Sequence, residues 1–239
     1  MSVSPGSGMT KAARVGAVAM RELMAAMGAA ATWVVVVVAG VCAALFGART
    51  KRLALYGAGK AVASLGFVAA AIASGATSSA WGSIALAALA IAAAGDIVLA
   101  LPGPRALLGG LAVFAVAHLT FTVAFAVRGV GAWPGTALAG VLAVGVVVLV
   151  WRWLRTHLRG EWRGAVALYL VVVAVMLCSG IASALHAASP LMALGIGLIA
   201  GSDVAVARHA FVEKSFLNKV WGLPVYYLGM VLIALSLGV

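Results

Sequence analysis

The sequence predicts an all-α protein that crosses a membrane with a bundle of eight transmembrane helices. Apolar residues make up 65% of the 239 residues and charged residues only 9%, whereas a soluble domain carries about 25% charged residues. The apolar residues form repeated runs of about 20, the length that crosses a bilayer as a helix. No alternation typical of strands interrupts these runs. A water-soluble domain and a disordered chain are therefore excluded.

The first apolar run follows the only long polar stretch of the chain, residues 1–24. It covers 25–46 and precedes the basic segment 49–52, with no small-residue cleavage site between them. A signal peptide has a shorter apolar region that ends at such a site. We therefore interpret 25–46 as the first transmembrane helix. We expect two regions, a polar N-terminal tail of residues 1–24 and a single eight-helix transmembrane domain of residues 25–239.

Seven more apolar runs follow, separated by residues that interrupt helices. Glycine, proline and serine mark four of the breaks, at 74–75, 102–104, 131–134 and 189–190, because these residues favour turns. Basic segments mark the other breaks. We expect the seven helices at 53–74, 81–101, 106–127, 133–151, 164–186, 190–207 and 220–238.

The basic residues predict the orientation of the helices. The connections after the first, third, fifth and seventh helices hold 11 of the 16 Lys and Arg residues, whereas the tail and the other connections hold four. Lys and Arg collect in cytoplasmic loops, so we expect these four connections in the cytoplasm and both termini outside. The formal net charge of the chain is +11, and the basic residues of these connections then lie near anionic lipid headgroups. We therefore expect no nucleic-acid partner.

Two of the five acidic residues lie inside predicted helices. Glu22, Glu161 and Glu213 fall in the tail or in basic loops, where they are solvated charges. Asp96 and Asp203 lie near the ends of the third and seventh helices. An acid inside a transmembrane helix costs roughly 2.5–3.5 kcal/mol on insertion scales. Two such costs in one small protein indicate a functional use.

Further polar residues fall in the same half of the predicted bundle as these aspartates. Lys60 lies about seven residues into the second helix, roughly 10 Å along its axis. Tyr226 and Tyr227 lie early in the eighth helix, which starts on the same side, and His118 lies deepest, near the middle of the fourth. We expect these side chains to form a polar pocket that opens toward the cytoplasmic leaflet.

The glycines of the seventh helix predict a close helix contact. Gly197 and Gly201 have the small-xxx-small spacing that lets membrane helices approach closely, and Gly195 widens that surface. We expect this pair to pack on a neighbouring helix beside Asp203.

The order and spacing of the polar residues resemble one known family. The matching residues are Lys60, Gly95-Asp96, Gly109 through Phe114-Ala-Val-Ala-His118, Tyr169, Met176, Gly201-Ser202-Asp203 and Tyr226-Tyr227-Leu228, over roughly residues 50–235. In this set the chain resembles the YhhN-like lysoplasmalogenase family. It departs from the family pattern at Ala61, Phe121 and Met230, which bear on substrate identity and leave the acids intact.

The resemblance implies an eight-helix membrane enzyme that hydrolyses the vinyl-ether bond of lysoplasmalogens to a fatty aldehyde and a glycerophospho-base. Such hydrolysis begins with protonation of the alkene carbon, and water captures the resulting oxocarbenium ion. It needs one acid that still holds its proton and one carboxylate, and two acids in a medium of low dielectric can supply both states. We expect no metal and no cofactor, catalysis by Asp96 and Asp203, and binding of the lysophospholipid substrate by Lys60, His118, Ser202, Tyr226 and Tyr227.

Several alternatives stay open at this point. Lys60 either binds the substrate phosphate, which we favour, or keeps one aspartate ionised. A metal-dependent hydrolase would use Asp96, His118 and Asp203 as ligands. An intramembrane aspartyl protease also uses two acids, but Ala93 stands where its first glycine is expected. A proton-coupled transporter or lipid-binding protein would use the acids as a relay.

The chain's location follows from its composition. The excess of Ala, Val, Gly and Arg indicates a GC-rich bacterial genome, so we expect a multi-pass protein of the bacterial inner membrane. The oligomeric state stays open.

Overall fold

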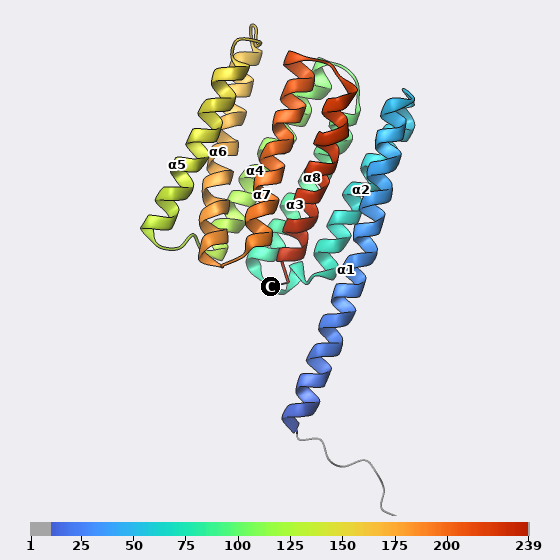
Figure 1. The fold of residues 1–239 in the computed structure, drawn as a ribbon, viewed down its shortest axis with the longest axis vertical. Helices are drawn as coiled ribbons and strands as arrows, with labels where there is room; N and C mark the ends of the chain where they lie inside the picture. The colour runs from blue at the N-terminus through green and yellow to red at the C-terminus, as the bar shows by residue number, and fades with distance from the viewer. Residues whose placement is uncertain (1–10, 239) are drawn as a thin grey trace, which may run out of the picture.

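The computed structural model describes the backbone of residues 11–238, and it describes burial and side-chain contacts for Gly28 and residues 30–238. Within this part the chain forms eight long α-helices and no strand, and all eight are long and apolar enough to cross a membrane. This confirms the predicted all-α, eight-helix class (Figure 1). The helices are α1 (Lys11–Arg49), α2 (Leu53–Ala73), α3 (Ala80–Ala100), α4 (Pro104–Arg128), α5 (Trp133–Leu154), α6 (Trp162–His186), α7 (Pro190–Ala207) and α8 (Phe216–Ser236), with a 3-10 turn η1 (Ala76–Ser78) and a π-helical turn η2 (Arg208–Val212).

Local signals fix where several helices begin. The Ser79 hydroxyl accepts from the backbone N–H of Gly82, three residues on, and caps α3. Proline occupies the first turn of α4, α5 and α7, where its missing N–H has no partner to lose. The eighth helix begins at Phe216, four residues before the predicted start. Pro224 therefore lies inside α8 and not in its first turn.

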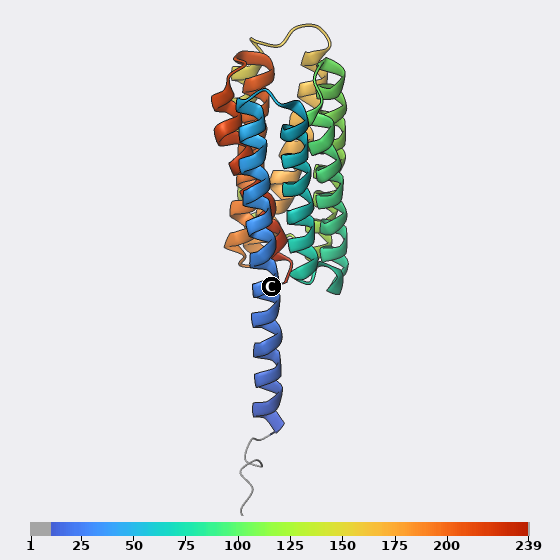
Figure 2. The same cartoon turned by 90° about the vertical axis from the view of Figure 1, so that its right-hand side faces the viewer.

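The first helix is longer than the sequence predicts. It begins at Lys11 and has 39 residues, so it is about 58 Å long. Figures 1 and 2 show its first half extending past the bundle at the end where the C-terminus lies. The part that fits a membrane span is Ala30–Arg49. Of the predicted tail 1–24, residues 11–24 are helical, and residues 1–10 lie outside the described residues.

The helices alternate in direction, so that the connections fall into two groups. The connections α1–α2, α3–α4, α5–α6 and α7–α8 all lie at one end of the bundle (Figure 1). These are the four connections that carry most of the basic residues. The bundle therefore has one basic end, and we refer to it by that name below.

Glycines bring the last two helices into close contact, and of the three glycines that we predicted only Gly195 lies at the closest approach. A Cβ on Gly195 would lie 2.9 Å from the carbonyl oxygen of Gly229, and a Cβ on Gly229 would lie 2.9 Å from the carbonyl oxygen of Gly195. A Cβ on Gly197 would meet nothing within 4 Å, and one on Gly201 only Val225, at 4.0 Å. The prediction was confirmed for Gly195 and wrong for close packing of the Gly197 and Gly201 pair on a neighbouring helix, because Gly197 lies about 200° around the helix from the face that carries Gly195.

Candidate active site

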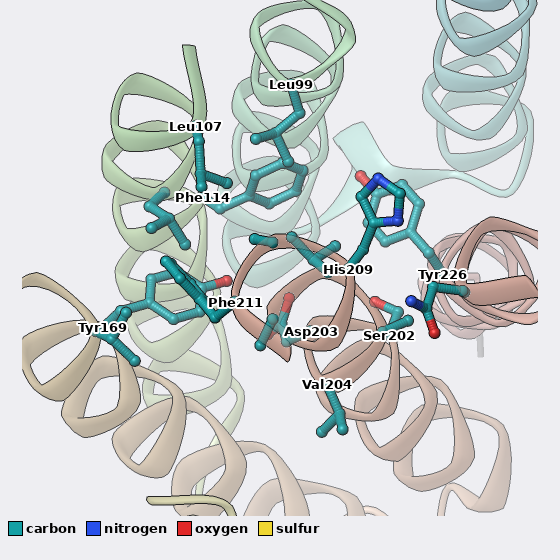
Figure 3. A pocket seen from close by; sticks show the side chains of 18 of the residues that line it. Leu99, Leu107, Phe114, Tyr169, Ser202, Asp203, Val204, His209, Phe211 and Tyr226 are labelled. Carbon is teal, nitrogen blue, oxygen red and sulfur yellow. The ribbon is translucent and has the colours of Figure 1, made fainter. Parts of the chain in front are cut away.

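A cavity of about 700 Å³ is lined by residues from all the helices from α2 to α8, and it opens at the basic end of the bundle. Figure 3 shows Phe114, Tyr169, Asp203 and Tyr226 reaching it from four different helices. Most of its wall is apolar, with a few polar side chains among them. An apolar cavity with few, grouped polar residues is typical of a site for an amphiphilic small molecule.

Asp96 of α3 is held by three donors. Lys60 Nζ lies 3.1 Å from Asp96 Oδ1. The hydroxyls of Ser64 and Tyr226 donate to Asp96 Oδ2, at 2.7 and 2.9 Å. Lys60, Ser64 and Asp96 are each at most 3% exposed, so this is a buried network in which three donors point at one carboxylate.

The helices place these donors by simple periodicity. Lys60 and Ser64 are four residues apart, so both project from one face of α2. Tyr227, next to Tyr226 on α8, donates its hydroxyl to the carbonyl oxygen of Lys60 at 3.1 Å and lies 3.2 Å from Ser64 Oγ. The network therefore joins α2, α3 and α8, which lie side by side in the bundle.

Gly95 makes room for an aromatic wall next to Asp96. A Cβ at Gly95 would lie 2.8 Å from Cε2 of Phe114. The Phe114 ring also packs edge-on against the ring of Tyr226, with centroids 5.8 Å apart. A larger residue at position 95 would push this ring away from the acid.

Asp203 of α7 has very different surroundings. His118 Nε2 lies 3.7 Å from Asp203 Oδ2, which is longer than a hydrogen bond. Both of these atoms are buried and lack a hydrogen-bond partner among the described residues. The hydroxyl of Tyr169 lies near enough to Asp203 to interact with its carboxyl group. Among the side chains that the structure describes, no Lys or Arg pairs with this carboxyl group as Lys60 pairs with Asp96.

The histidine is oriented by its own helix. His118 Nδ1 lies 2.6 Å from the carbonyl oxygen of Phe114, one turn earlier on α4. A carbonyl oxygen only accepts, so Nδ1 carries a proton. In the neutral ring Nε2 is then an acceptor, and it faces Asp203. The Tyr169 ring packs edge-on against the imidazole, with centroids 5.7 Å apart.

The structure brings the predicted site residues together, although not all of them reach the cavity. Lys60, Asp96, Ser202, Asp203 and Tyr226 line the cavity. His118 lies behind Asp203, and Tyr227 lies behind Lys60 and Ser64; neither lines the wall. The Ser202 hydroxyl donates to the carbonyl oxygen of Ile199 in its own helix, at 2.7 Å.

Sequence reasoning missed Ser64 as a site residue, and named Tyr169 only as a family match. The signal for Ser64 was its spacing, since it follows Lys60 by one helical turn. The signal for Tyr169 was rarity, because the chain has four tyrosines and all of them lie at the site. Tyr56, Tyr169 and Tyr226 line the cavity, and Tyr227 joins the Asp96 network.

The donor set expected of a metal-dependent hydrolase is not assembled. Among the described residues no three His, Cys, Asp or Glu side chains converge as metal ligands. Both oxygens of Asp96 already accept from Lys60, Ser64 and Tyr226, so this carboxylate is not arranged as a metal ligand.

Two residues that depart from the family pattern do not reach the cavity. Phe121 and Met230 are each 1% exposed and lie in the core, outside the cavity wall. Phe121 stacks on Phe125, with ring centroids 5.9 Å apart. Their identity therefore bears on helix packing rather than on direct contact with a ligand.

Comparison with known proteins gives one match. The sequence pattern of the YhhN family matches residues 57–237, which cover most of the chain and all the side chains of the cavity discussed above except Tyr56. No curated protein and no solved structure matches the chain.

Proposed function

The chain belongs to the YhhN family, and from this membership and the two carboxyl groups of the cavity we propose that the protein hydrolyses the vinyl-ether bond of lysoplasmalogens. The products are a fatty aldehyde and a glycerophospho-base. The protein is an integral multi-pass membrane protein, which we place in the inner membrane of a bacterium. The observation that carries the proposal is that two acids share one cavity in opposite surroundings.

We assign to Asp96 the role of the carboxylate. An ammonium group and two hydroxyls all donate to its oxygens. Donors and a nearby cation favour the charged form of a carboxyl group. A fixed negative charge beside the cavity stabilises the positive charge that develops on the substrate when the alkene is protonated. Lys60 serves this role by keeping Asp96 ionised, so the contact at 3.1 Å favours the second of its two predicted functions.

We assign to Asp203 the role of the acid. Its Oδ2 faces the acceptor nitrogen of His118 and no cation. The two facing atoms are 3.7 Å apart and make no hydrogen bond, and burial disfavours a bare charge on the carboxyl group. We therefore assign the proton to Asp203. His118 acts as a positioning residue, and Asp203, which lines the cavity, touches the substrate.

The reaction follows from these two assignments. Asp203 gives its proton to the alkene carbon that is not bonded to oxygen, and the alkene π electrons form the new C–H bond. The positive charge on the adjacent carbon and its oxygen lies next to the Asp96 carboxylate. Water adds to that carbon and returns a proton to Asp203. The hemiacetal then breaks its C–O bond, and its hydroxyl proton moves to the glycerol oxygen, which releases the aldehyde and the alcohol.

The test compares three lysophospholipids with one headgroup and one chain length but an alkenyl, alkyl or acyl linkage. Protein purified in detergent should release aldehyde from the alkenyl lipid and nothing from the other two. Asp96→Asn and Asp203→Asn should each remove nearly all turnover in a folded protein, and the double variant should be little worse, because the two acids act as a unit.

Other outcomes would point to other functions. Fatty acid released from the acyl lipid would identify an acyl hydrolase. Loss of activity in strong chelator would revive the metal-dependent alternative. Absence of turnover on all three lipids would contradict the proposal and favour the transporter or lipid-binding protein.

A further inference from the structure

The mouth of the cavity carries three basic side chains that the proposed reaction does not use. His209 of η2, Lys214 of the α7–α8 connection and Lys219 of α8 all line the cavity, and we call them the basic mouth. Lys219 is close enough to Lys60 and Lys214 for electrostatic repulsion, and His209 is close enough to both Lys214 and Lys219. The charges of Lys214 and Lys219 are therefore gathered at one edge of the cavity, with the His209 ring beside them.

The acidic groups nearby are committed to other partners. Arg208 donates to Glu213 at 2.5 Å and to Asn218 Oδ1 at 2.6 Å, and Asn218 Nδ2 donates to the carbonyl oxygen of Glu213 at 2.7 Å. These contacts hold the α7–α8 connection in place, and they pair its one carboxylate, Glu213, with Arg208. Within the described residues neither Lys214 nor Lys219 has an acidic partner.

An aromatic ring fixes the position of Lys219. Its ammonium lies 4.3 Å from the centre of the Tyr56 ring, and the ammonium of Lys60 lies 5.9 Å from the same ring. A cation over an aromatic face is held without being neutralised. Lys219 is partly buried rather than free in solvent, so its charge stays at the cavity edge.

We propose that the basic mouth binds the phosphate of the lysophospholipid headgroup, with Lys219 as its main ligand and Lys214 and His209 beside it. This inference rests on the proposed function and deepens it. It replaces Lys60, which is buried against Asp96, as the phosphate ligand. A phosphate supplies the negative charge that this cluster lacks and accepts several hydrogen bonds at once.

The spacing along α8 agrees with the length of the substrate. Lys219 precedes Tyr226 by seven residues, which is roughly 10 Å along the helix, and Tyr226 donates to Asp96. In a lysoplasmalogen about seven bonds separate the phosphorus from the carbon to be protonated, roughly 8 Å when extended. A phosphate at the basic mouth therefore places the vinyl ether at the depth of the acids.

One wall of the cavity is apolar and suits the hydrocarbon chain. Val147, Val150 and Leu154 of α5 and Val166 and Leu170 of α6 line the cavity without a polar group among them. The basic mouth lies on η2, the α7–α8 connection and α8. The cavity thus combines a basic edge with an apolar wall, which suits a substrate that has an anionic headgroup and a hydrocarbon chain.

The test uses Lys219→Met, which keeps the aliphatic stem and removes the charge. For the alkenyl lysophospholipid we expect KM to rise about tenfold or more with little change in kcat, since a charged hydrogen bond is lost. For 1-alkenylglycerol, which lacks the phosphate, both constants should stay near wild type. Lys219→Arg should recover most of the loss. Lys51→Met removes an exposed lysine at the basic end that does not line the cavity, and it should change neither substrate's kinetics.

Binding of non-cleavable lipids separates this proposal from the proposed reaction. The purified protein should bind 1-alkyl lysophospholipid about tenfold less tightly after Lys219→Met, and 1-alkylglycerol equally well. Inorganic phosphate should compete only weakly if the headgroup, and not the free ion, is the ligand. If Lys219→Met folds poorly, the exposed Lys214→Met carries the same comparison.

Each result decides one question. Equal loss of affinity for both lipids, or no loss for the lysophospholipid, would overturn the phosphate site. Strong competition by inorganic phosphate would reassign the site to the free ion. Lysine-dependent binding without hydrolysis of any alkenyl lipid would leave the phosphate site standing and reject the proposed reaction.

Discussion

Lys60 and Asp96 form a buried ion pair whose free energy depends on both members being present. Each side chain is at most 4% exposed, and the two charges are 3.1 Å apart. Desolvation of two charges is costly, so such a pair adds little net stability compared with apolar residues. Removing one partner is different, because the other charge then stays buried and unpaired.

This asymmetry predicts the behaviour of Lys60→Met. We expect it to lower the free energy of unfolding by roughly 3–5 kcal/mol and to reduce kcat with little change in KM. The double variant Lys60→Met/Asp96→Asn should recover most of the stability but no activity. Unfolding in detergent and steady-state kinetics measure the two effects. Additive losses of stability would show that the two side chains are not coupled, and a change confined to KM would restore Lys60 as the phosphate ligand.

The sequence predicted the important residues of this network but not their partners. The cost of an acid in a transmembrane helix was enough to single out Asp96, and burial was enough to single out Lys60. Ser64 carries no such cost, because a hydroxyl can donate to its own helix. Its role became visible only when α2 and α3 were placed together and its hydroxyl met the carboxylate.

Among the helices, the α7–α8 pair best shows how an element positions the site. It carries Asp203 on one helix and Tyr226 on the other, and the two helices approach closely at Gly195 and Gly229. In lipid, helices associate by close packing because no hydrophobic effect drives them together. The contact at these glycines therefore sets how near Tyr226 comes to Asp96.

Matched glycine substitutions test this contact. At Gly229 a Cβ would lie 2.9 Å from a backbone oxygen of α7, so Gly229→Ala must separate the helices. We expect a loss of roughly 1–3 kcal/mol and reduced hydrolysis, because Tyr226 lies one turn away. At Gly197 the space is open, so Gly197→Ala should be neutral or stabilising by up to about 1 kcal/mol. Thermal unfolding and turnover of both variants give the comparison, and equal behaviour would contradict this account of the crossing.

For the molecule as a whole, the basic end predicts the orientation of the bundle in the membrane. The four connections there hold most of the Lys and Arg residues, and the cavity opens at the same end. From the positive-inside rule we expect the cavity mouth in the cytoplasmic leaflet. A lysophospholipid would reach it from that leaflet.

Reporter fusions test this orientation. Alkaline phosphatase fused after Val239 should be active, and a fluorescent protein fused there should stay dark if it is exported unfolded, because we expect the C-terminus outside. The same reporters fused within the α5–α6 connection, after Arg159, should give the reverse pattern. A cytoplasmic C-terminus would place the cavity in the opposite leaflet without changing its chemistry.

The sequence by itself determined the class of the protein and the number of membrane-spanning helices within the described residues. It also singled out Asp96 and Asp203 as the acids that lie inside those helices. The physical reason is the bilayer, which demands about 20 apolar residues per helix and penalises each charge inside it. Both quantities can be read along the chain without knowing which helices touch.

Only the tertiary structure decided which groups meet. It gave three donors to Asp96 and left Asp203 facing His118, and it gathered Lys214 and Lys219 at the cavity mouth. It also showed that Gly195, and not Gly197, contacts α8. A face of a helix becomes a contact only through the rotation and crossing of its neighbours. These depend on side chains far apart in sequence, so the pattern along one helix does not specify them.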